Sequence, residues 1–398
     1  MALISKKYFQ ILLFFHLYFY FLLSKCFILI FKPAPSKGRI LYLAAFYPHN
    51  AGSHWRVEKW AEYLREKGYN VDILYALNEL AFNDYNNNPS RFLIRFLRKR
   101  FFQVLKARHY EIVIVRREVL LFNEYGNLFL EKLLRKLSKH LILDFDDDLS
   151  ASKNQPRAIC LFYPRLMLAN GNSFRNSFSY YDKYIVASSY LKALVKEQTH
   201  IPSENIAIIP TCVDYDKYPA KDYTKLNETI TLGWIGGDHN YTYLHNIITV
   251  LNELAQKHTF RLMVIGGQPF VADAQFPIIN KKWSLETEVE DLYQIDVGLM
   301  PLDYSDESKG KGGFKLIQYM GLGIVSVAQD LTINKEIAKD GEYAFLAKDD
   351  ADWYRIVNEI LNGRINFEEM GRKAKKRIEN SYTFNSNFDT YLTFVCVE

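Results

Sequence analysis

The sequence predicts an α/β protein that contains two doubly wound domains, each a parallel sheet covered by helices. Its 398 residues are too many for one ordinary domain. Short apolar runs typical of buried strands alternate with helical segments in both halves of the chain. A polar stretch of little periodicity, residues 211–227, separates the halves. We therefore expect one domain over residues 39–210 and a second over residues 211–385.

The first half opens with a strand, a loop, a helix and a second strand over residues 39–77. The loop carries Gly52, Ser53 and His54, and the amphipathic helix begins at Trp55. Ligands of doubly wound domains bind beyond the carboxyl ends of the strands. We expect these loop residues to face a ligand cleft. For His54, a surface histidine near a helix start is the alternative.

An acidic cluster follows the strand expected over His140–Phe145. It contains Asp144, Asp146, Asp147 and Asp148. Carboxylates this close repel one another, so the cluster needs a cation, strong hydrogen bonds or full exposure. At a strand end it should face the cleft. Capping of the loop or support of the fold is the alternative.

The remaining expected elements complete both domains. In the first half they are the helices Arg91–Arg108, Glu124–Lys139 and Ser188–Gln198 and the strands Glu111–Arg117, Asp182–Ala187 and Asn205–Pro210. In the second half they are the strands Ile230–Ile235, Arg261–Ile265 and Asp296–Leu302 and helices over residues 242–258, 283–292, 334–339, 350–361, 367–380 and 385–397.

Residues 308–330 form a glycine loop, a helix and a buried strand. Gly310, Gly312 and Gly313 precede the helix expected over residues 314–320. A helix start behind such a loop binds anions, because its first N–H groups have no partner within the helix. The spacing of Lys311, Lys315 and Gln318 places them on one helix face, which suits a diphosphate with a polar group attached. A packing helix with two solvated lysines is the alternative.

Residues 310–320 resemble the donor-site segment of family 4 glycosyltransferases, which have the GT-B fold of two Rossmann-like domains. The bacterial branch reads G-K-x-G-[FY]-K-L-[IL]-Q-Y-M-A-x-G, and only the alanine differs, replaced by Gly321. The motifs G-S-H-W-R-V, D-F-D-D, I-P-T-C-V-D, G-W-I-G, D-V-G-L-M-P-L and G-K-G-G-F-K-L-I-Q-Y-M occur in the family's order. The resemblance covers most of the chain after Arg39. It also implies that residues 386–398 form a helix crossing back to the first domain.

The resemblance implies a set of residues that bind the nucleotide-sugar donor: Gly236, Gly237, Lys311, Gly312, Gly313, Phe314, Lys315 and Gln318. Many relatives carry two glutamates where this chain has Gly310 and Gln318, so the standard assignment of catalytic roles is open. Lys315 would stabilise the diphosphate leaving group. The donor would be UDP- or GDP-linked, and no further cofactor or metal is implied.

The D-F-D-D motif implies that Asp146 or Asp147 orients the acceptor or the transferred sugar. A metal-binding D-x-D of GT-A glycosyltransferases is the other interpretation. We reject it as first choice, because GT-A enzymes hold nucleotide and metal in one domain and the phosphate-type loop here lies far downstream.

The N-terminal segment, residues 1–38, contains an apolar run long enough to cross a bilayer, Tyr8–Phe31. Lys25 inside the run also fits a helix that lies in the membrane interface, and a buried domain helix is the third interpretation. The basic helix 91–108 suits either an anionic membrane surface or ordinary core packing. Basic residues beyond the run place the main body at the cytoplasmic face of the bacterial inner membrane.

Composition excludes other classes of protein. A net charge of +5 and the absence of a recognisable nucleic-acid-binding motif argue against nucleic acid as a partner. The four cysteines (Cys26, Cys160, Cys212 and Cys396) are too scattered for a disulfide framework or a zinc site.

We expect a retaining glycosyltransferase that moves a sugar to a glycan or lipid-linked acceptor in cell-surface polysaccharide synthesis. A GT-B-fold nucleotide-sugar epimerase and a non-catalytic nucleotide-sugar-binding subunit are the alternatives. A dehydrogenase is disfavoured, because no strand is followed by a convincing G-x-G-x-x-G.

Overall fold

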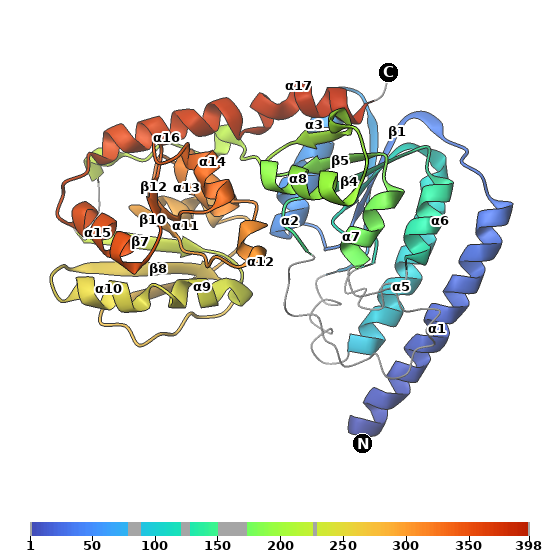
Figure 1. Cartoon of the computed structure of the whole chain (residues 1–398), viewed down its shortest axis with the longest axis horizontal. Helices are drawn as coiled ribbons and strands as arrows, with labels where there is room; N and C mark the ends of the chain where they lie inside the picture. The colour runs from blue at the N-terminus through green and yellow to red at the C-terminus, as the bar shows by residue number, and fades with distance from the viewer. Residues whose placement is uncertain (1, 79–88, 121–127, 150–172, 226–228, 397–398) are drawn as a thin grey trace. The chain divides into compact units, whose positions relative to one another are not determined.

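The computed structural model describes residues 2–78, 89–120, 128–149, 173–225 and 229–396. The chain divides into two compact units (Figure 1). The first unit contains residues 1–209 and 390–398, and the second contains residues 210–389. Cys160 and parts of the expected helix 124–139 and of the stretch 211–227 lie outside the described residues.

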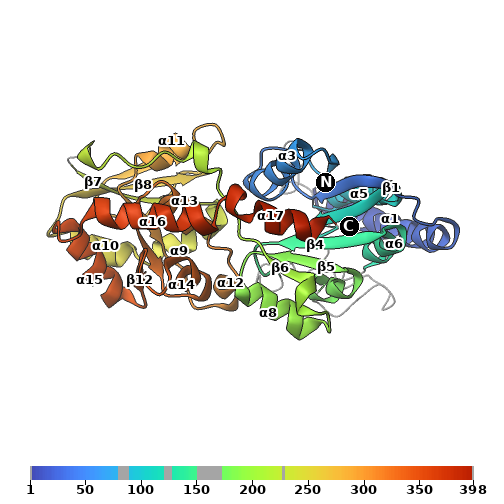
Figure 2. The ribbon, with the colours of Figure 1, turned by 90° about the horizontal axis from the view of Figure 1, so that it is seen from above.

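The first unit is a six-stranded parallel sheet in the order β2-β1-β3-β4-β5-β6. Its strands are β1 Ser36–Ala44, β2 Asn70–Tyr75, β3 Tyr110–Arg116, β4 His140–Phe145, β5 Lys183–Val186 and β6 Ile206–Ile208. Its main helices are α1 Ala2–Ile30, α3 Lys59–Glu66, α5 Pro89–Lys106, α6 Phe129–Leu137, α7 Ser173–Ser177 and α8 Ser189–Gln198. The central strands are apolar runs because helices cover the sheet (Figure 2).

The second unit is also a six-stranded parallel sheet, in the order β12-β11-β10-β7-β8-β9. Its strands are β7 Ile230–Ile235, β8 Phe260–Gly266, β9 Ile278–Lys282, β10 Val297–Met300, β11 Val325–Gln329 and β12 Phe345–Ala347. Its helices are α9 Tyr241–His245, α10 Ile248–Ala255, α11 Glu288–Tyr293, α12 Asp306–Lys309, α13 Phe314–Gly321, α14 Thr332–Ala338, α15 Asp350–Leu361 and α16 Phe367–Ser381.

The last helix, α17 Phe384–Val395, begins in the second unit and ends in the first. Its Tyr391 stacks on Trp60 of α3 with ring centroids 4.0 Å apart, and its hydroxyl lies 2.6 Å from that of Tyr42 on β1. Both aromatic partners are fully buried. The end of the chain is therefore part of the core of the first unit.

Each sheet contains one point where the direction of winding reverses. In the first sheet this point lies between β1 and β3, and in the second it lies between β7 and β10. Parallel α/β sheets bind ligands beyond the carboxyl ends of the strands at such a point. The segments after β1 and β3 and those after β7 and β10 therefore lie where such folds bind ligands, and the segment after β4 adjoins them.

Several local expectations were wrong. The helix expected from Trp55 begins at Ala51, because the Asn50 side chain accepts from the N–H of Gly52 and caps it. Gly52, Ser53 and His54 are therefore helical and not part of a loop. The expected helix 242–258 breaks into α9 and α10 near residues 246–247. Strand β9 and the short helix α12 were not expected.

Of the two interpretations of the helix expected over residues 91–108, core packing holds for its apolar side. Phe92, Phe96, Leu97 and Phe101 of α5 are buried, and α5 packs against α1 and α6. Phe102 is the large apolar side chain of α5 that is exposed.

The carboxyl group of Glu131 on α6 is buried, and its Oε2 has no hydrogen-bond partner among the described residues. Burial raises its pKa from 4.5 to about 8, and the nearby carboxyl of Glu118 adds to the rise. Between these values the folded chain holds a proton that the unfolded chain lacks. Stability therefore falls as pH rises from 4.5 towards 8.

We expect Glu131→Gln to leave stability nearly unchanged at pH 5 and to raise the free energy of unfolding by about 1–3 kcal/mol at pH 8. Thermal unfolding at the two pH values measures this. Glu66→Gln, on the exposed end of α3, is the control. Equal effects of Glu131→Gln at both pH values would contradict a buried titrating carboxyl.

Candidate functional site

The loop before α13 is built around Gly313. Its backbone is left-handed, with φ at +72°, and a Cβ there would lie 2.4 Å from Cδ1 of Ile337. Glycine alone fits this position. The N–H of Leu316 donates to the carbonyl of Gly313, so the helix starts immediately after the turn. The sequence-based position of this helix start is confirmed.

Lys315 lies on the first turn of α13 and reaches the end of β7. Its Nζ lies 5.3 Å from the centre of the Trp234 ring. A Cβ on Gly236, the residue after β7, would lie 2.7 Å from Cε of Lys315. The missing side chain at Gly236 therefore lets the ammonium group pass over the strand end. Gly236 and Lys315, both predicted donor residues, are brought together.

Lys311 lies in the loop before α13 and not on the helix. Its Nζ donates to Oδ1 of Asn240 over 3.3 Å, and it lies 3.6 Å from Oε1 of Glu307. Asn240 belongs to the turn that follows Gly237. Both lysines therefore contact the segment after β7, beside the N-terminus of α13. The positive end of that helix and two ammonium groups favour an anion there.

Gln318 is buried and held by partners that sequence reasoning missed. Its amide Nε2 donates to Oε1 of Glu288 over 2.8 Å and lies 3.4 Å from the hydroxyl of Tyr218. The other carboxylate oxygen of Glu288 accepts from the Trp283 indole over 2.6 Å. Because Glu288 fixes the amide nitrogen, the amide oxygen of Gln318 is left as the acceptor. Neither spacing nor composition indicates these contacts.

Tyr319 holds α13 on the sheet. Its hydroxyl accepts from the N–H of Ile235 over 3.0 Å and lies 3.4 Å from the carbonyl of Leu299. A Cβ on Gly298 would lie 2.4 Å from the Tyr319 ring, so the glycine allows the close approach. The helix start is thereby fixed at the reversal point between β7 and β10.

The second glycine pair, Gly266 and Gly267, meets the same segment. Oδ1 of Asp238 accepts from the N–H of Gly267 over 2.7 Å and from that of Gln268 over 3.1 Å. Asp238 therefore ties the turn after β7 to the turn after β8.

In the first unit, buried arginines compensate the acidic cluster after β4. Arg56 makes two bonds to the Asp144 carboxylate, of 2.6 and 3.2 Å, and a third of 2.7 Å to the carbonyl of Ile209. Arg116 bridges Asp144 at 3.3 Å and Asp146 at 2.6 Å. Arg175 pairs with Asp148 at 3.0 Å. Asp144 and Asp148 are therefore structural.

Asp146 keeps a partly exposed carboxylate, with 19% of its side chain accessible. Burial would raise its pKa, but Arg116, Arg56 and Arg117 outweigh that effect and hold the pKa well below its usual range. Asp146 is therefore ionised at neutral pH. Asp147 lies beside it, half-buried.

The helix after β1 brings polar residues to the same edge. Residues His54–Glu58 form a π-helical turn, a feature often found at functional sites. A Cβ on Gly52 would lie 3.8 Å from Nη2 of Arg116, the atom that binds Asp146. Gly52 and Asp146 therefore both lie beside the guanidinium group of Arg116. Ser53 is buried.

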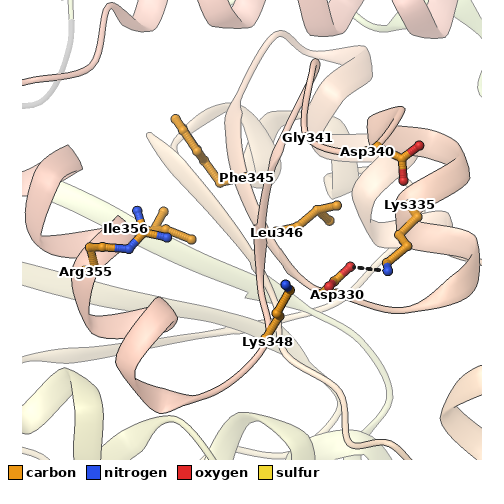
Figure 3. A pocket seen from close by; sticks show the side chains of 9 residues that line it. All are labelled: Asp330, Lys335, Asp340, Gly341, Phe345, Leu346, Lys348, Arg355 and Ile356. Atoms are coloured by element: carbon orange, nitrogen blue, oxygen red, sulfur yellow. Dashed lines mark ion pairs between the residues drawn. The ribbon is translucent and has the colours of Figure 1, made fainter.

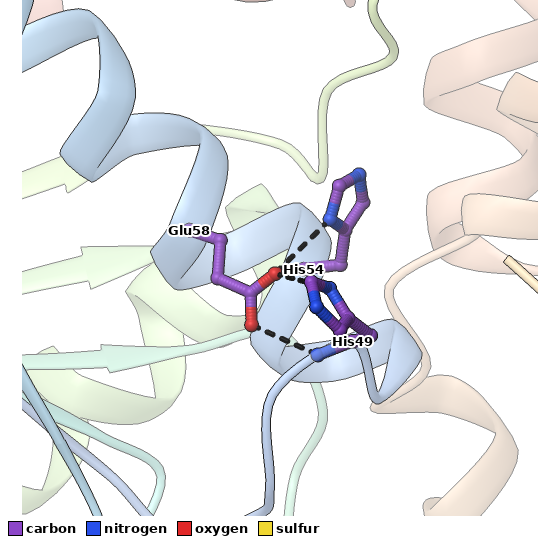
Figure 4. A group of neighbouring side chains, drawn as sticks. All are labelled: His49, His54 and Glu58. Carbon is purple, nitrogen blue, oxygen red and sulfur yellow. Dashed lines mark hydrogen bonds and ion pairs between the residues drawn. The ribbon is translucent and has the colours of Figure 1, made fainter.

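Glu58 orients His54 (Figure 4). Its Oε2 lies 3.2 Å from Nδ1 of His54 and 3.4 Å from Nδ1 of His49, and its Oε1 accepts from the N–H of His49 and the hydroxyl of Tyr75. Burial would raise the pKa of Glu58, but these hydrogen bonds lower it overall. The bond to Nδ1 directs Nε2 of His54 away from Glu58.

Within the described parts of the chain, His49, His54 and Glu58 are the one group of three ligand-type side chains close enough to share a metal ion. The aspartates after β4 do not form such a group there. Four polar groups of His49, His54 and Tyr75 already surround the two carboxylate oxygens of Glu58. We therefore assign Glu58 to the orientation of His54.

A separate pocket lies among α14, β12 and α15 (Figure 3). Its charged lining residues are Asp330, Lys335, Asp340, Lys348 and Arg355. Lys335 is paired with Asp330 at 3.0 Å. None of the residues predicted to bind the donor lines this pocket.

Comparison with known proteins identifies the fold. The chain matches sucrose-phosphate synthase from Thermosynechococcus elongatus with a TM-score of 0.61 at 12% identity, covering 89% of this chain and 97% of that one. It matches a glycosyltransferase from Rickettsia africae with a TM-score of 0.60 at 12% sequence identity, covering 90% of this chain and 99% of that one. It also matches HepE from Anabaena, solved with UDP and glucose. The TM-score is 0.59 at 11% sequence identity, and the match covers 89% of this chain and 98% of that one.

No protein-family model matches the sequence, and no curated protein matches it. The structural neighbours share the two six-stranded parallel sheets with helices, so the chain has the GT-B fold. The predicted fold class is confirmed. Membership of family 4 stays a prediction.

We expect Asp144→Asn and Asp146→Asn to differ sharply in stability. The first leaves buried Arg56 without its countercharge and should lower the free energy of unfolding by about 3 kcal/mol. The second removes a partly exposed charge whose amide still accepts from Arg116, and should cost about 1 kcal/mol. Denaturant unfolding measures both variants. Equal losses, or a larger loss for Asp146→Asn, would contradict the assignment of Asp144 as structural.

Proposed function

We propose that the protein is a retaining glycosyltransferase. It transfers a sugar from a UDP- or GDP-linked donor to a glycan or lipid-linked acceptor in cell-surface polysaccharide synthesis. The observation that carries this proposal is the meeting of Lys311, Lys315 and the N-terminus of α13 at the end of β7. The GT-B fold supports it, since structural neighbours such as HepE are solved with UDP or UDP-glucose. Lipid-linked acceptors agree with a position at the cytoplasmic face of the bacterial inner membrane.

The donor diphosphate lies, in this proposal, at the start of α13. Negative charge builds up on the diphosphate as the bond to the sugar breaks. Lys315, Lys311 and the first N–H groups of α13 stabilise that charge without moving, because Gly236, Gly313 and Tyr319 have already fixed their positions. In this scheme no metal ion takes part in the reaction.

Gln318 takes the place of a carboxylate that would bind a ribose hydroxyl. Glu288 holds its amide nitrogen, so the amide oxygen is presented as an acceptor. A fixed amide oxygen can accept a hydrogen bond from a hydroxyl as a carboxylate does, although with less charge.

The acceptor side belongs, in this proposal, to the first unit. Gly52, Ser53 and His54 follow β1, and Asp146 and Asp147 follow β4. Nε2 of His54 and the ionised carboxylate of Asp146 are hydrogen-bond acceptors for sugar hydroxyls. Arg116 holds Asp146 in place.

A non-catalytic nucleotide-sugar-binding subunit is the second candidate. Gly310 stands where the resembling enzymes carry a glutamate near the transferred sugar, and a glycine supplies no side chain there. Such a subunit would bind the donor at α13 and release no nucleotide.

Lys315→Ala is the first test. The full chain, in membranes, is given UDP- and GDP-sugars with and without a lipid-linked acceptor extract, and nucleotide release is recorded. We expect acceptor-dependent release that Lys315→Ala lowers about a hundredfold or more. Lys309→Ala is the matched control, because Lys309 is a neighbouring lysine on α12 that pairs with Asp306.

The outcomes separate the candidates. Release that Lys315→Ala and Lys309→Ala lower equally would contradict the role of α13. Donor binding without release for any acceptor would favour the binding subunit. Release that needs no acceptor, with free sugar as product, would favour an epimerase of the same fold.

Glu288→Gln tests the orientation of Gln318. Loss of the charged partner should free the amide and weaken donor binding about five- to tenfold, with kcat nearly unchanged. Glu290→Gln, an exposed residue of the same helix, is the control. An unchanged KM for the donor would show that Glu288 has only a structural role.

A further inference from the structure

Helix α1 presents an apolar face that no described part of the chain covers. Between Ile11 and Leu23 it contains no charged residue. Its exposed large side chains are Ile11, Phe15, Tyr18, Phe19, Leu22, Leu29 and Ile30, with accessible fractions between 44% and 85%. By length and composition the stretch Ile11–Ile30 is able to cross a membrane. Apolar faces of this size mark a site of interaction.

The opposite face of α1 is part of the protein core. Leu13, Leu17, Tyr20 and Ser24 follow one another at helical spacing and are at most 6% exposed. They face α5 and α6, which lie beside α1 (Figure 1). A helix that crosses a bilayer would have to leave these partners.

Two aromatic contacts show what that departure would cost. The Tyr20 ring lies 4.7 Å from the ring of Phe101 on α5, and the Phe21 ring lies 6.4 Å from that of Phe129 on α6. Phe101 and Phe129 are themselves buried. Removing α1 would expose both sides of this interface, whereas a helix lying in the membrane surface keeps it.

Charge identifies the partner of the apolar face. The sequences of α1 and α5 contain no aspartate or glutamate. Arg95, Arg98, Lys99 and Lys106 of α5 surround a surface hollow beside exposed Phe102. Helix α5 packs directly against α1, and Arg98 is near enough to Tyr20 of α1 to act on it electrostatically. The α5 cations of two copies would repel each other, whereas anionic lipid is complementary to them.

We propose that α1 lies in the plane of an anionic membrane surface, with its outer apolar face inserted and the α5 cations on lipid phosphates, while its inner face stays packed on the first unit. Each cation near such a surface contributes a several-fold increase in binding. This inference deepens the membrane position proposed above. It does not depend on the transfer reaction, and its test measures no activity.

The first experiment measures flotation of the purified full chain with vesicles of phosphatidylcholine alone or mixed with an equal part of phosphatidylglycerol. We expect stronger binding to the anionic vesicles, reduced by salt. The triple variant Arg95→Gln, Arg98→Gln, Lys99→Gln should weaken that binding about a hundredfold, at about fivefold for each charge. The control, Arg372→Gln, Lys373→Gln, Lys376→Gln on exposed α16, changes the net charge equally.

The second experiment separates a helix in the surface from one that crosses. In a chain whose native cysteines are replaced by serine, Lys7→Cys and Lys32→Cys mark the two ends of α1. A membrane-impermeant maleimide added outside sealed vesicles should label both. Labelling of one end only, until the vesicles are opened, would show a spanning helix and overturn the proposal.

Two further results would also overturn it. One is equal binding to neutral and anionic vesicles. The other is no vesicle binding but a concentration-dependent dimer in sedimentation that Phe15→Glu dissociates, which would identify a second copy as the partner.

Discussion

Each sheet of this protein reverses its winding direction once, and the candidate site depends on that reversal. Crossover connections between parallel strands are right-handed, so helices that follow strands on either side of the reversal lie on opposite faces of the sheet. The turns after the two strands at that point therefore have space between them. Gly236 follows β7 and the α13 loop follows β10, on the two sides of the reversal in the second sheet. Gly52 follows β1 and Arg116 ends β3, on the two sides of the reversal in the first.

The carboxyl-terminal edges of the two sheets carry different charged side chains. In the second unit the cations Lys311 and Lys315 converge with the positive end of a helix. Lys311 contacts Asn240, and Lys315 lies over the Trp234 ring. In the first unit the carboxylates after β4 would repel each other, and buried Arg56 and Arg116 prevent this. The same arginines keep Asp146 ionised.

Local sequence patterns predicted most of the fold. Apolar runs of strand length and helical periodicity gave β7 and α15 at their observed bounds. Patterns failed where apolar periodicity does not mark the element. The amphipathic pattern from Trp55 misses the earlier helix start, which depends on the Asn50 cap. Strand β9 has a mixed pattern, since it pairs with β8 alone at the edge of its sheet.

The candidate site also contains parts that the sequence predicted and parts that it did not. Glycine positions predicted the start of α13, because Gly313 acts within its own turn. Lysine spacing was wrong for Lys311, which lies in the loop and contacts distant Asn240. Glu288 lies thirty residues before its partner Gln318, and no spacing rule connects them. The composition of α1 is the same whether it crosses a membrane or lies on one. Its packing on α5 and α6 is not encoded in that composition.

The absence of a glutamate at Gly310 bears on how such a site would work. A carboxylate near the transferred sugar adds negative charge close to a diphosphate that is itself becoming more negative. Without it, Lys311 and Lys315 would act in the proposed reaction with one carboxylate fewer nearby, and Glu307, 3.6 Å from Lys311, would be the competing charge that remains. Asp238, the nearest carboxylate after β7, is engaged by the N–H groups of Gly267 and Gln268 and is thereby partly neutralised. The proposed reaction would therefore depend on the position and charge of Lys311, Lys315 and the start of α13, the kind of catalysis that a fixed helix terminus can perform.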